Sequence, residues 1–140
     1  MTNPWNQIFT NSKPQDLVNP YHKFNLILAD LKKHKATKVI DIACGNGRHL
    51  ETLAESGIKE IFGFDLSKKA VELSKERVKK YGADSNISQG NMYEKFSYDD
   101  SSFDGAIAIQ AIYHGNKENF ENSIKEAKRI LKEGKPFIFT

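Results

Sequence analysis

Hydrophobic residues follow two alternating patterns along most of the chain. Over residues 21–31 they recur every three or four positions, which predicts a helix that ends in the polar residues 32–35. Residues 38–42 then form a short apolar run that predicts a strand, followed by a turn with two glycines. Helical spacing returns after this turn and stops at Gly57.

The unit of strand and helix repeats further along. Residues 60–65 predict a second strand, and Ser67 is placed to cap a helix that runs to Gly82. Two more strands are expected over residues 87–89 and 103–109.

The final part of the chain adds one helix and one strand. Helical spacing predicts a helix that begins near Asn116 and ends at Gly134, and residues 136–140 predict a last strand. Strands that alternate with helices form parallel sheets, because a right-handed crossover between parallel neighbours needs about one helix. The predicted fold class is therefore α/β, a doubly wound parallel sheet with helices on both faces.

The first twenty residues differ from the rest. They contain three of the four prolines and no apolar period, so we expect an irregular leader there. We divide the chain into a leader with its helix, residues 1–37, and one α/β domain, residues 38–140. A length of 140 residues with 39% hydrophobic content fits a single domain with a real core.

Composition restricts the cellular compartment and the kinds of partner that we expect. The lone Cys44 cannot form an internal disulfide and no secretory signal opens the chain, so we expect a cytoplasmic protein. No apolar run approaches the roughly 20 residues of a membrane helix. The net charge of +3 is spread over many lysines, which does not favour nucleic acid as a partner. The four histidines lack metal-ligand spacing, so no metal is expected.

Candidate chemistry gathers where the first two strands end, the edge at which parallel sheets bind ligands. Gly45 and Gly47 permit a sharp turn and close approach of a ligand to the main chain. A dinucleotide loop would need a third glycine where Leu50 stands. Asp41 would repel a pyrophosphate but suits a cationic ligand. Asp65 can accept hydrogen bonds from ribose hydroxyls, which supports a nucleoside in either case.

Five motifs in order resemble those of the class I S-adenosylmethionine-dependent methyltransferases. They are VIDIACGNG (39–47), GFDLS (63–67), QGNM (89–92), SFDGAIA (102–108) and EAKRILKEGKPFIF (126–139). The resemblance covers residues 38–140. It implies the family's Rossmann-like sheet, with strand order 3-2-1-4-5, and a reaction that converts S-adenosylmethionine to S-adenosylhomocysteine.

The resemblance also implies a cofactor site. Asp41, Gly45 and Gly47 would hold the methionine part, and Asp65 would hold the ribose hydroxyls. The complete set of implied cofactor residues is Asp41, Ala43, Cys44, Gly45, Gly47, Asp65, Leu66, Asn91, Met92 and Gln110.

The adenine would lie beside Leu66, with Asn91 and Met92 completing its pocket. The family more often has an acidic residue at the Asn91 position. The amide oxygen of Asn91 can still accept a hydrogen bond from the adenine amine, but without charge assistance.

The acceptor would approach the loop after the fourth strand. Residues 110–114 would face the transferable methyl, and Tyr113 and His114 are the candidate catalytic residues. His114 can take a proton if the acceptor has one to lose. The Asn/Asp-Pro-Pro-aromatic motif of relatives that methylate adenine or glutamine amides is absent, which argues against those substrates.

Several other side chains keep alternative interpretations. Trp5, Phe9 and Tyr21 either form an aromatic lid over the site or simply cover the sheet. We interpret Cys44 as a small packed residue and His49 as a helix-surface residue.

Family members usually continue past the fifth strand with a helix and an antiparallel pair. Strands six and seven of that pattern are missing here, so the apolar residues 136–140 would form an unprotected edge. We expect this edge to pair with another chain, giving a homodimer, or to be covered by the N-terminal leader.

The leading functional hypothesis is a methyltransferase that acts on a small-molecule acceptor. One alternative is a fragment that binds S-adenosylmethionine without catalysis. The other is a nicotinamide-dependent oxidoreductase, which Asp41 and the Leu50 at the third glycine position argue against.

Overall fold

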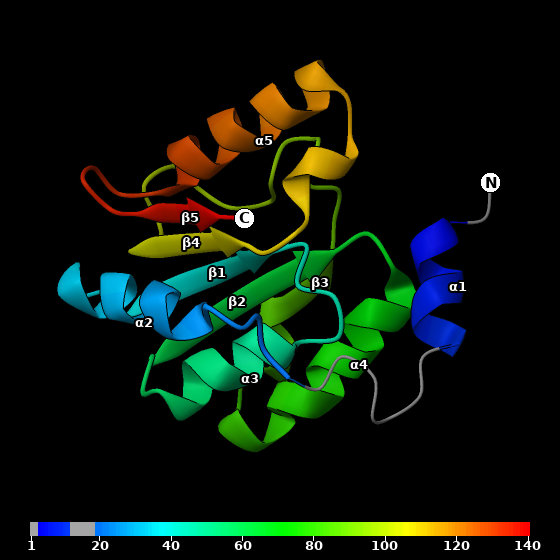
Figure 1. The fold of residues 1–140 in the computed structure, drawn as a ribbon, viewed down its shortest axis with the longest axis horizontal. Helices are drawn as coiled ribbons and strands as arrows, with labels where there is room; N and C mark the ends of the chain where they lie inside the picture. The colour runs from blue at the N-terminus through cyan, green and yellow to red at the C-terminus, as the bar shows by residue number, and fades with distance from the viewer. Residues whose placement is uncertain (1–2, 12–18) are drawn as a thin grey trace.

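The computed structural model describes residues 3–11 and 19–140, which contain one five-stranded sheet (Figure 1). The strands are β1 Lys38–Ile42, β2 Glu60–Asp65, β3 Ile87–Gln89, β4 Gly105–Ala108 and β5 Phe137–Phe139. Their order is β3-β2-β1-β4-β5, and every neighbouring pair is parallel. The doubly wound α/β fold and the predicted strand order are confirmed.

Helices cover both faces of the sheet (Figure 1). On one face lie α2 Phe24–Lys33, α3 Arg48–Glu55 and α4 Lys68–Val78, and on the other lies α5 Lys117–Ile130. The remaining elements are α1 Pro4–Asn11, beside α4, and the 3-10 turns η1 Lys79–Tyr81, η2 Asp84–Asn86 and η3 Ile112–His114. Within the described residues, no helix has the length and apolar character needed to cross a membrane.

Strand β1 separates the two layers of the core. Val39 packs in the layer of α2, α3 and α4, whereas Ile40 and Ile42 pack in the layer of α5. All three side chains are fully buried, because successive residues of a central parallel strand face opposite covered sides of the sheet. Asp41 is equally buried in this apolar strand, which marks it as a residue that packing alone does not explain.

A second buried aspartate, Asp104, lies at the amino ends of the strands, opposite the ends where Asp41 and Asp65 lie. Asp104 accepts hydrogen bonds from the Thr37 hydroxyl at 2.8 Å, the Lys38 main-chain N–H at 3.0 Å and the Lys132 ammonium at 3.0 Å. Burial opposes ionisation of Asp104, but these donors outweigh it and lower the pKa of Asp104 to about 2. This carboxylate therefore stabilises the starts of β1 and β4.

The N-terminal segment differs from the prediction, because Pro4–Asn11 is a helix where an irregular leader was expected. The Asn3 side-chain oxygen accepts a hydrogen bond from the Trp5 N–H at 3.0 Å, as a helix cap does. Pro4 follows at the first helical position, where its missing N–H leaves no bond unmade. Residues 12–18, which belong to the segment expected to be irregular, lie outside the described residues.

Two predicted boundaries shift near the end of the chain. Helix α5 ends at Ile130 instead of Gly134, because Leu131 is extended and bridges to Phe103. The strand predicted over residues 103–109 is correspondingly shorter, at Gly105–Ala108.

Strand β5 forms one edge of the described sheet. Phe139 on this strand is 43% exposed, and its ring contacts that of Phe120 at 6.0 Å between centroids. Helix α1 packs against α4, well away from β5, so the described part of the leader does not cover this edge (Figure 1). Pairing of β5 with another chain stays a prediction.

Candidate functional site

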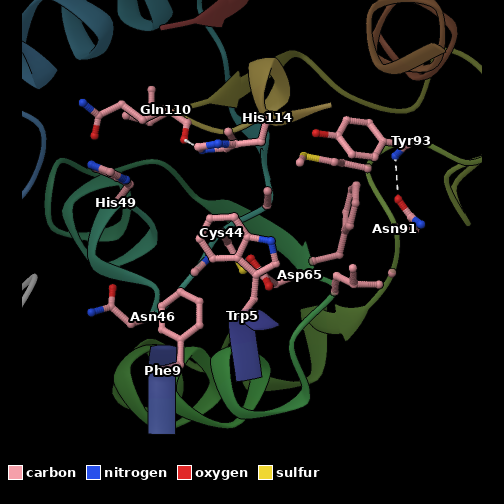
Figure 2. A pocket seen from close by; sticks show the side chains of 18 of the residues that line it. Trp5, Phe9, Cys44, Asn46, His49, Asp65, Asn91, Tyr93, Gln110 and His114 are labelled. Carbon is pink, nitrogen blue, oxygen red and sulfur yellow. Dashed lines mark hydrogen bonds between the residues drawn. The ribbon is translucent and has the colours of Figure 1, made fainter. Parts of the chain in front are cut away.

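A cavity of about 680 Å³ opens where β1, β2 and β4 end (Figure 2). Most residues predicted for the site line it, namely Ala43, Cys44, Gly45, Asp65, Leu66, Asn91, Met92, Gln110, Tyr113 and His114. Asp41 and Gly47 were also predicted but do not line the cavity themselves. Lining residues outside the predicted set include Asn46, Arg48, His49, Phe64, Gly90, Tyr93 and Ile109. Most of these lie in or next to a recognised motif, which is the signal that would have found them.

The turn after β1 depends on left-handed backbone. Ala43, Gly45 and Gly47 have φ angles of 58°, 56° and 82°. A Cβ on Gly47 would lie 2.9 Å from the Cα of Ser74, so no side chain fits there. The Ser74 hydroxyl donates a hydrogen bond to the Gly45 carbonyl at 2.6 Å, which fixes the turn against α4. Cys44, which precedes Gly45 in this turn, is buried as expected of a small packed residue.

Asp65, at the end of β2, is held by main-chain donors. Its two carboxylate oxygens accept hydrogen bonds from the N–H groups of Gly45 and Ser67, each at 2.9 Å. Burial raises the pKa of Asp65, and these hydrogen bonds oppose the rise. The Leu66 N–H is a third main-chain donor to this carboxylate. Three donors leave at least one of the four lone-pair sites open, so the carboxylate is fixed in direction and still able to accept from a ligand.

Asp41 is 1% exposed, and its Oδ2 has no hydrogen-bond partner among the described residues. Burial raises the pKa of Asp41 well above its usual value, and the nearby Asp65 raises it further, whereas Arg48 opposes the rise. A buried carboxylate oxygen without a partner is costly, unless a ligand supplies the missing donor. Asp41 thus lies under the cavity wall as an unsatisfied acceptor.

His49, predicted to lie on the helix surface, is instead 5% exposed. Its Nε2 accepts a hydrogen bond from the Tyr21 N–H at 2.9 Å, and its ring stacks on Phe24 at 4.9 Å between centroids. Burial, with a smaller contribution from Arg48, lowers the pKa of His49 to about 4. Helical spacing could not reveal this, because the burying residues come from another segment of the chain.

At the predicted adenine end of the cavity, the side-chain oxygen of Asn91 is not free to accept from the adenine amine in the way the sequence suggested. The Asn91 side-chain oxygen accepts a hydrogen bond from the Tyr93 N–H at 2.8 Å, so it is engaged in a local turn (Figure 2). Gly90 lies against Phe64, since a Cβ on Gly90 would approach that ring to 3.2 Å. Phe64, which is mostly buried, and the exposed Leu66 line the cavity at this end and give it apolar character.

The loop after β4 directs His114 toward the cavity. Gln110 has a left-handed φ of 52°, and its carbonyl lies 3.0 Å from Nε2 of His114. Because a carbonyl only accepts, Nε2 carries the proton and Nδ1 of the neutral ring remains an acceptor. Tyr113 is adjacent and exposed, with its ring 4.5 Å from that of His114.

Helix α1 lies over the cavity mouth. Trp5 and Phe9 line the cavity, and the Trp5 ring contacts His114 edge-on at 5.3 Å between centroids (Figure 2). The Asn6 side-chain oxygen accepts a hydrogen bond from the Ser67 hydroxyl at 2.6 Å, which fastens α1 to the start of α4. Of the three aromatic residues considered for a lid, Tyr21 alone does not line the cavity and packs on the core.

Two curated relatives illustrate the similarity. The chain is 31% identical over 110 residues to 24-methylenesterol C-methyltransferase 3 of Arabidopsis thaliana, covering 77% of this chain and 30% of that protein. It is 30% identical over 145 residues to the ubiquinone biosynthesis O-methyltransferase of Pelagibacter ubique, covering 91% and 58%. The chain thus spans between about a third and three fifths of these relatives.

The fold and the sequence also match known proteins more broadly. The PH0226 protein from Pyrococcus horikoshii has a similar structure, with a TM-score of 0.71, 24% identity, and coverage of 96% of this chain and 66% of that one. Residues 39–134 match the family described as methyltransferase domain. The chain therefore belongs to the methyltransferase domain family, with the Rossmann-like fold of the class I S-adenosylmethionine-dependent enzymes.

Proposed function

We propose that this chain binds S-adenosylmethionine in the cavity and transfers its methyl group to a small-molecule acceptor. The observation that carries the proposal is the buried Asp41 carboxylate beside a loop that requires glycine, since its Oδ2 has no partner among residues 3–11 and 19–140. A cofactor with a cationic amino group fits this site, because a carboxylate just behind the cavity wall favours a cation over an anion there.

The other cofactor groups have matching residues. Asp65, fixed by main-chain N–H groups, would accept hydrogen bonds from the ribose hydroxyls. Phe64, Leu66 and Met92 would pack on the adenine. Asn91 would contribute through its main chain or its amide nitrogen, since its side-chain oxygen is already engaged.

When bound, the cofactor supplies an electrophilic methyl on a sulfonium. The protein then has to align an acceptor with this methyl and exclude water, which accounts for much of the acceleration of such a transfer. Tyr113 and Trp5 would line the acceptor site beside His114, and Nδ1 of His114 would take the proton that the acceptor loses. The hydrogen bond to Gln110 leaves that nitrogen available.

The names of the relatives support a small acceptor, since they describe methylation of a sterol and a step of ubiquinone biosynthesis. The second candidate is binding of the cofactor without catalysis. A homodimer through β5, a cytoplasmic setting and the absence of nucleic-acid partners stay predictions.

Calorimetric titration tests the cofactor class. S-adenosylmethionine and S-adenosylhomocysteine are expected to bind, whereas NAD is expected to give no heat. Asp65→Asn is expected to weaken both sulfur nucleosides. Binding of NAD in preference to them would overturn the proposal, and turnover with a panel of small acceptors would separate catalysis from binding alone.

A further inference from the structure

The hydrogen bonds of His49 fix which of its nitrogens carries the proton. Nε2 lies 2.9 Å from the main-chain nitrogen of Tyr21, which is always a donor, and the Arg48 Nε–H approaches the same atom at 3.5 Å. Nε2 must therefore accept. A neutral imidazole has one protonated nitrogen, so the proton is on Nδ1.

The ring is also fixed in charge and in orientation. Burial lowers the pKa of His49 to about 4, so the side chain is neutral at physiological pH. Phe24 stacks on one face of the ring at an interplanar angle of 24°. These contacts leave little freedom for the ring to rotate.

The Nδ1–H group has no acceptor within the described part of the chain, although His49 lines the cavity. Figure 2 shows His49 with Asn46 and Gln110 on one side of the cavity, and Asn91 and Tyr93 on the opposite side. The free donor thus lies at the end away from the predicted adenine pocket.

We propose that the Nδ1–H of His49 donates a hydrogen bond to the carboxylate of the amino acid part of the cofactor. The inference rests on the proposed function. That part of the cofactor has one cationic and one anionic group, and the acidic Asp41 suits only the cation. The anion needs donors, and His49 supplies a neutral one whose direction is set before the ligand arrives.

Two substitutions separate the two nitrogens. His49→Gln places an oxygen near the position of Nε2, so it keeps an acceptor for the Tyr21 N–H and loses the donor at Nδ1. His49→Asn places an amide N–H near the position of Nδ1 and keeps that donor. Affinity is measured by calorimetry for S-adenosylhomocysteine and for 5′-methylthioadenosine, which has the same nucleoside and sulfur but no amino acid part.

We expect His49→Gln to weaken S-adenosylhomocysteine about tenfold or more, as for a lost hydrogen bond to a charged group, and to leave 5′-methylthioadenosine nearly unchanged. His49→Asn should recover part of the loss. Equal weakening of both ligands would assign His49 a structural role only, and no weakening of either would also overturn the inference. A wild-type chain that binds neither ligand would overturn the proposed function, and this inference with it.

The ligand-free protein offers an independent check. A two-bond ¹H–¹⁵N correlation spectrum is expected to show protonated Nδ1 and unprotonated Nε2 for His49. The opposite tautomer would overturn the inference regardless of any binding result.

Discussion

Replacing Asp41 by asparagine is expected to stabilise the ligand-free chain while weakening cofactor binding. The carboxylate is buried in β1, and its Oδ2 has no hydrogen-bond partner in the described part of the chain. Burial raises its pKa, and the nearby Asp65 raises it further. Asp41→Asn has nearly the same shape and removes the charge. The amide leaves a polar atom at the same place, so the gain comes from removing the charge. We expect a gain of about 1–3 kcal/mol in the free energy of unfolding at pH 7, because an ionised carboxylate costs more to bury than a neutral amide.

The pH dependence of this gain has a definite sign. Because folding raises the pKa of Asp41, the folded chain binds more protons than the unfolded chain as pH rises above about 4. Stability of the wild type therefore falls with rising pH through that window, and the penalty is complete only above the folded pKa. As pH falls through about 4, the carboxyl becomes protonated in the unfolded state as well, and the difference between wild type and Asp41→Asn should shrink toward zero.

Urea unfolding of both proteins by far-ultraviolet circular dichroism, from pH 3.5 to 8, measures this difference. Calorimetry with S-adenosylhomocysteine on the same samples gives the binding loss. If Asp41→Asn is less stable than the wild type at pH 7 without ligand, the carboxylate is paired and the reasoning fails.

Three other substitutions test the turn, the opposite sheet edge and the covering helix. Gly47→Ala is expected to cost about 2–5 kcal/mol of unfolding free energy through strain and a clash, whereas Gly57→Ala, at φ 93° in open space, costs strain alone, about 1–2 kcal/mol. Equal losses in urea titrations would refute the clash. Asp104→Asn is expected to cost about 2 kcal/mol at neutral pH, fading as pH falls from about 4 to 2, with S-adenosylhomocysteine affinity unchanged. A constant loss down to pH 2 would contradict the assigned pKa. Asn6→Ala is expected to raise acrylamide quenching of Trp5, the single tryptophan, at an unchanged melting temperature, and unaltered quenching would show that the bond does not hold α1.

Much of the fold could be predicted because its signals are local. The Ser67 hydroxyl caps α4 by accepting a hydrogen bond from the Ala70 N–H at 3.1 Å, and Asn116 caps α5 in the same way. Both caps were placed by residue type and by the apolar spacing that follows. The ends of α5 and β4 were less accurate, because the bridge between Phe103 and Leu131 joins segments that the periodicity treats separately.

The candidate site was predictable where motif and strand end coincide. Asp65 and Gly45 come from two different motifs, and both line the cavity. The Gly45 N–H donates a hydrogen bond to the Asp65 carboxylate, so the ends of the two strands meet as predicted. His49 was misjudged because its partner, the Tyr21 N–H, lies 28 residues earlier in the chain. The sequence assigned the Asn91 side chain to the adenine, but its oxygen accepts a hydrogen bond from the main-chain N–H two residues later. Asparagine often makes such local bonds, but residue type alone does not show whether a given asparagine does so.

The most direct test of the account is an isotope-filtered nuclear Overhauser spectrum of the chain with S-adenosylmethionine labelled with ¹³C at its transferable methyl. We expect cross-peaks from that methyl to ring protons of Tyr113, His114 or Trp5, at the mouth of the cavity. Cross-peaks to Leu66 and Met92 instead, or no bound cofactor at all, would contradict it.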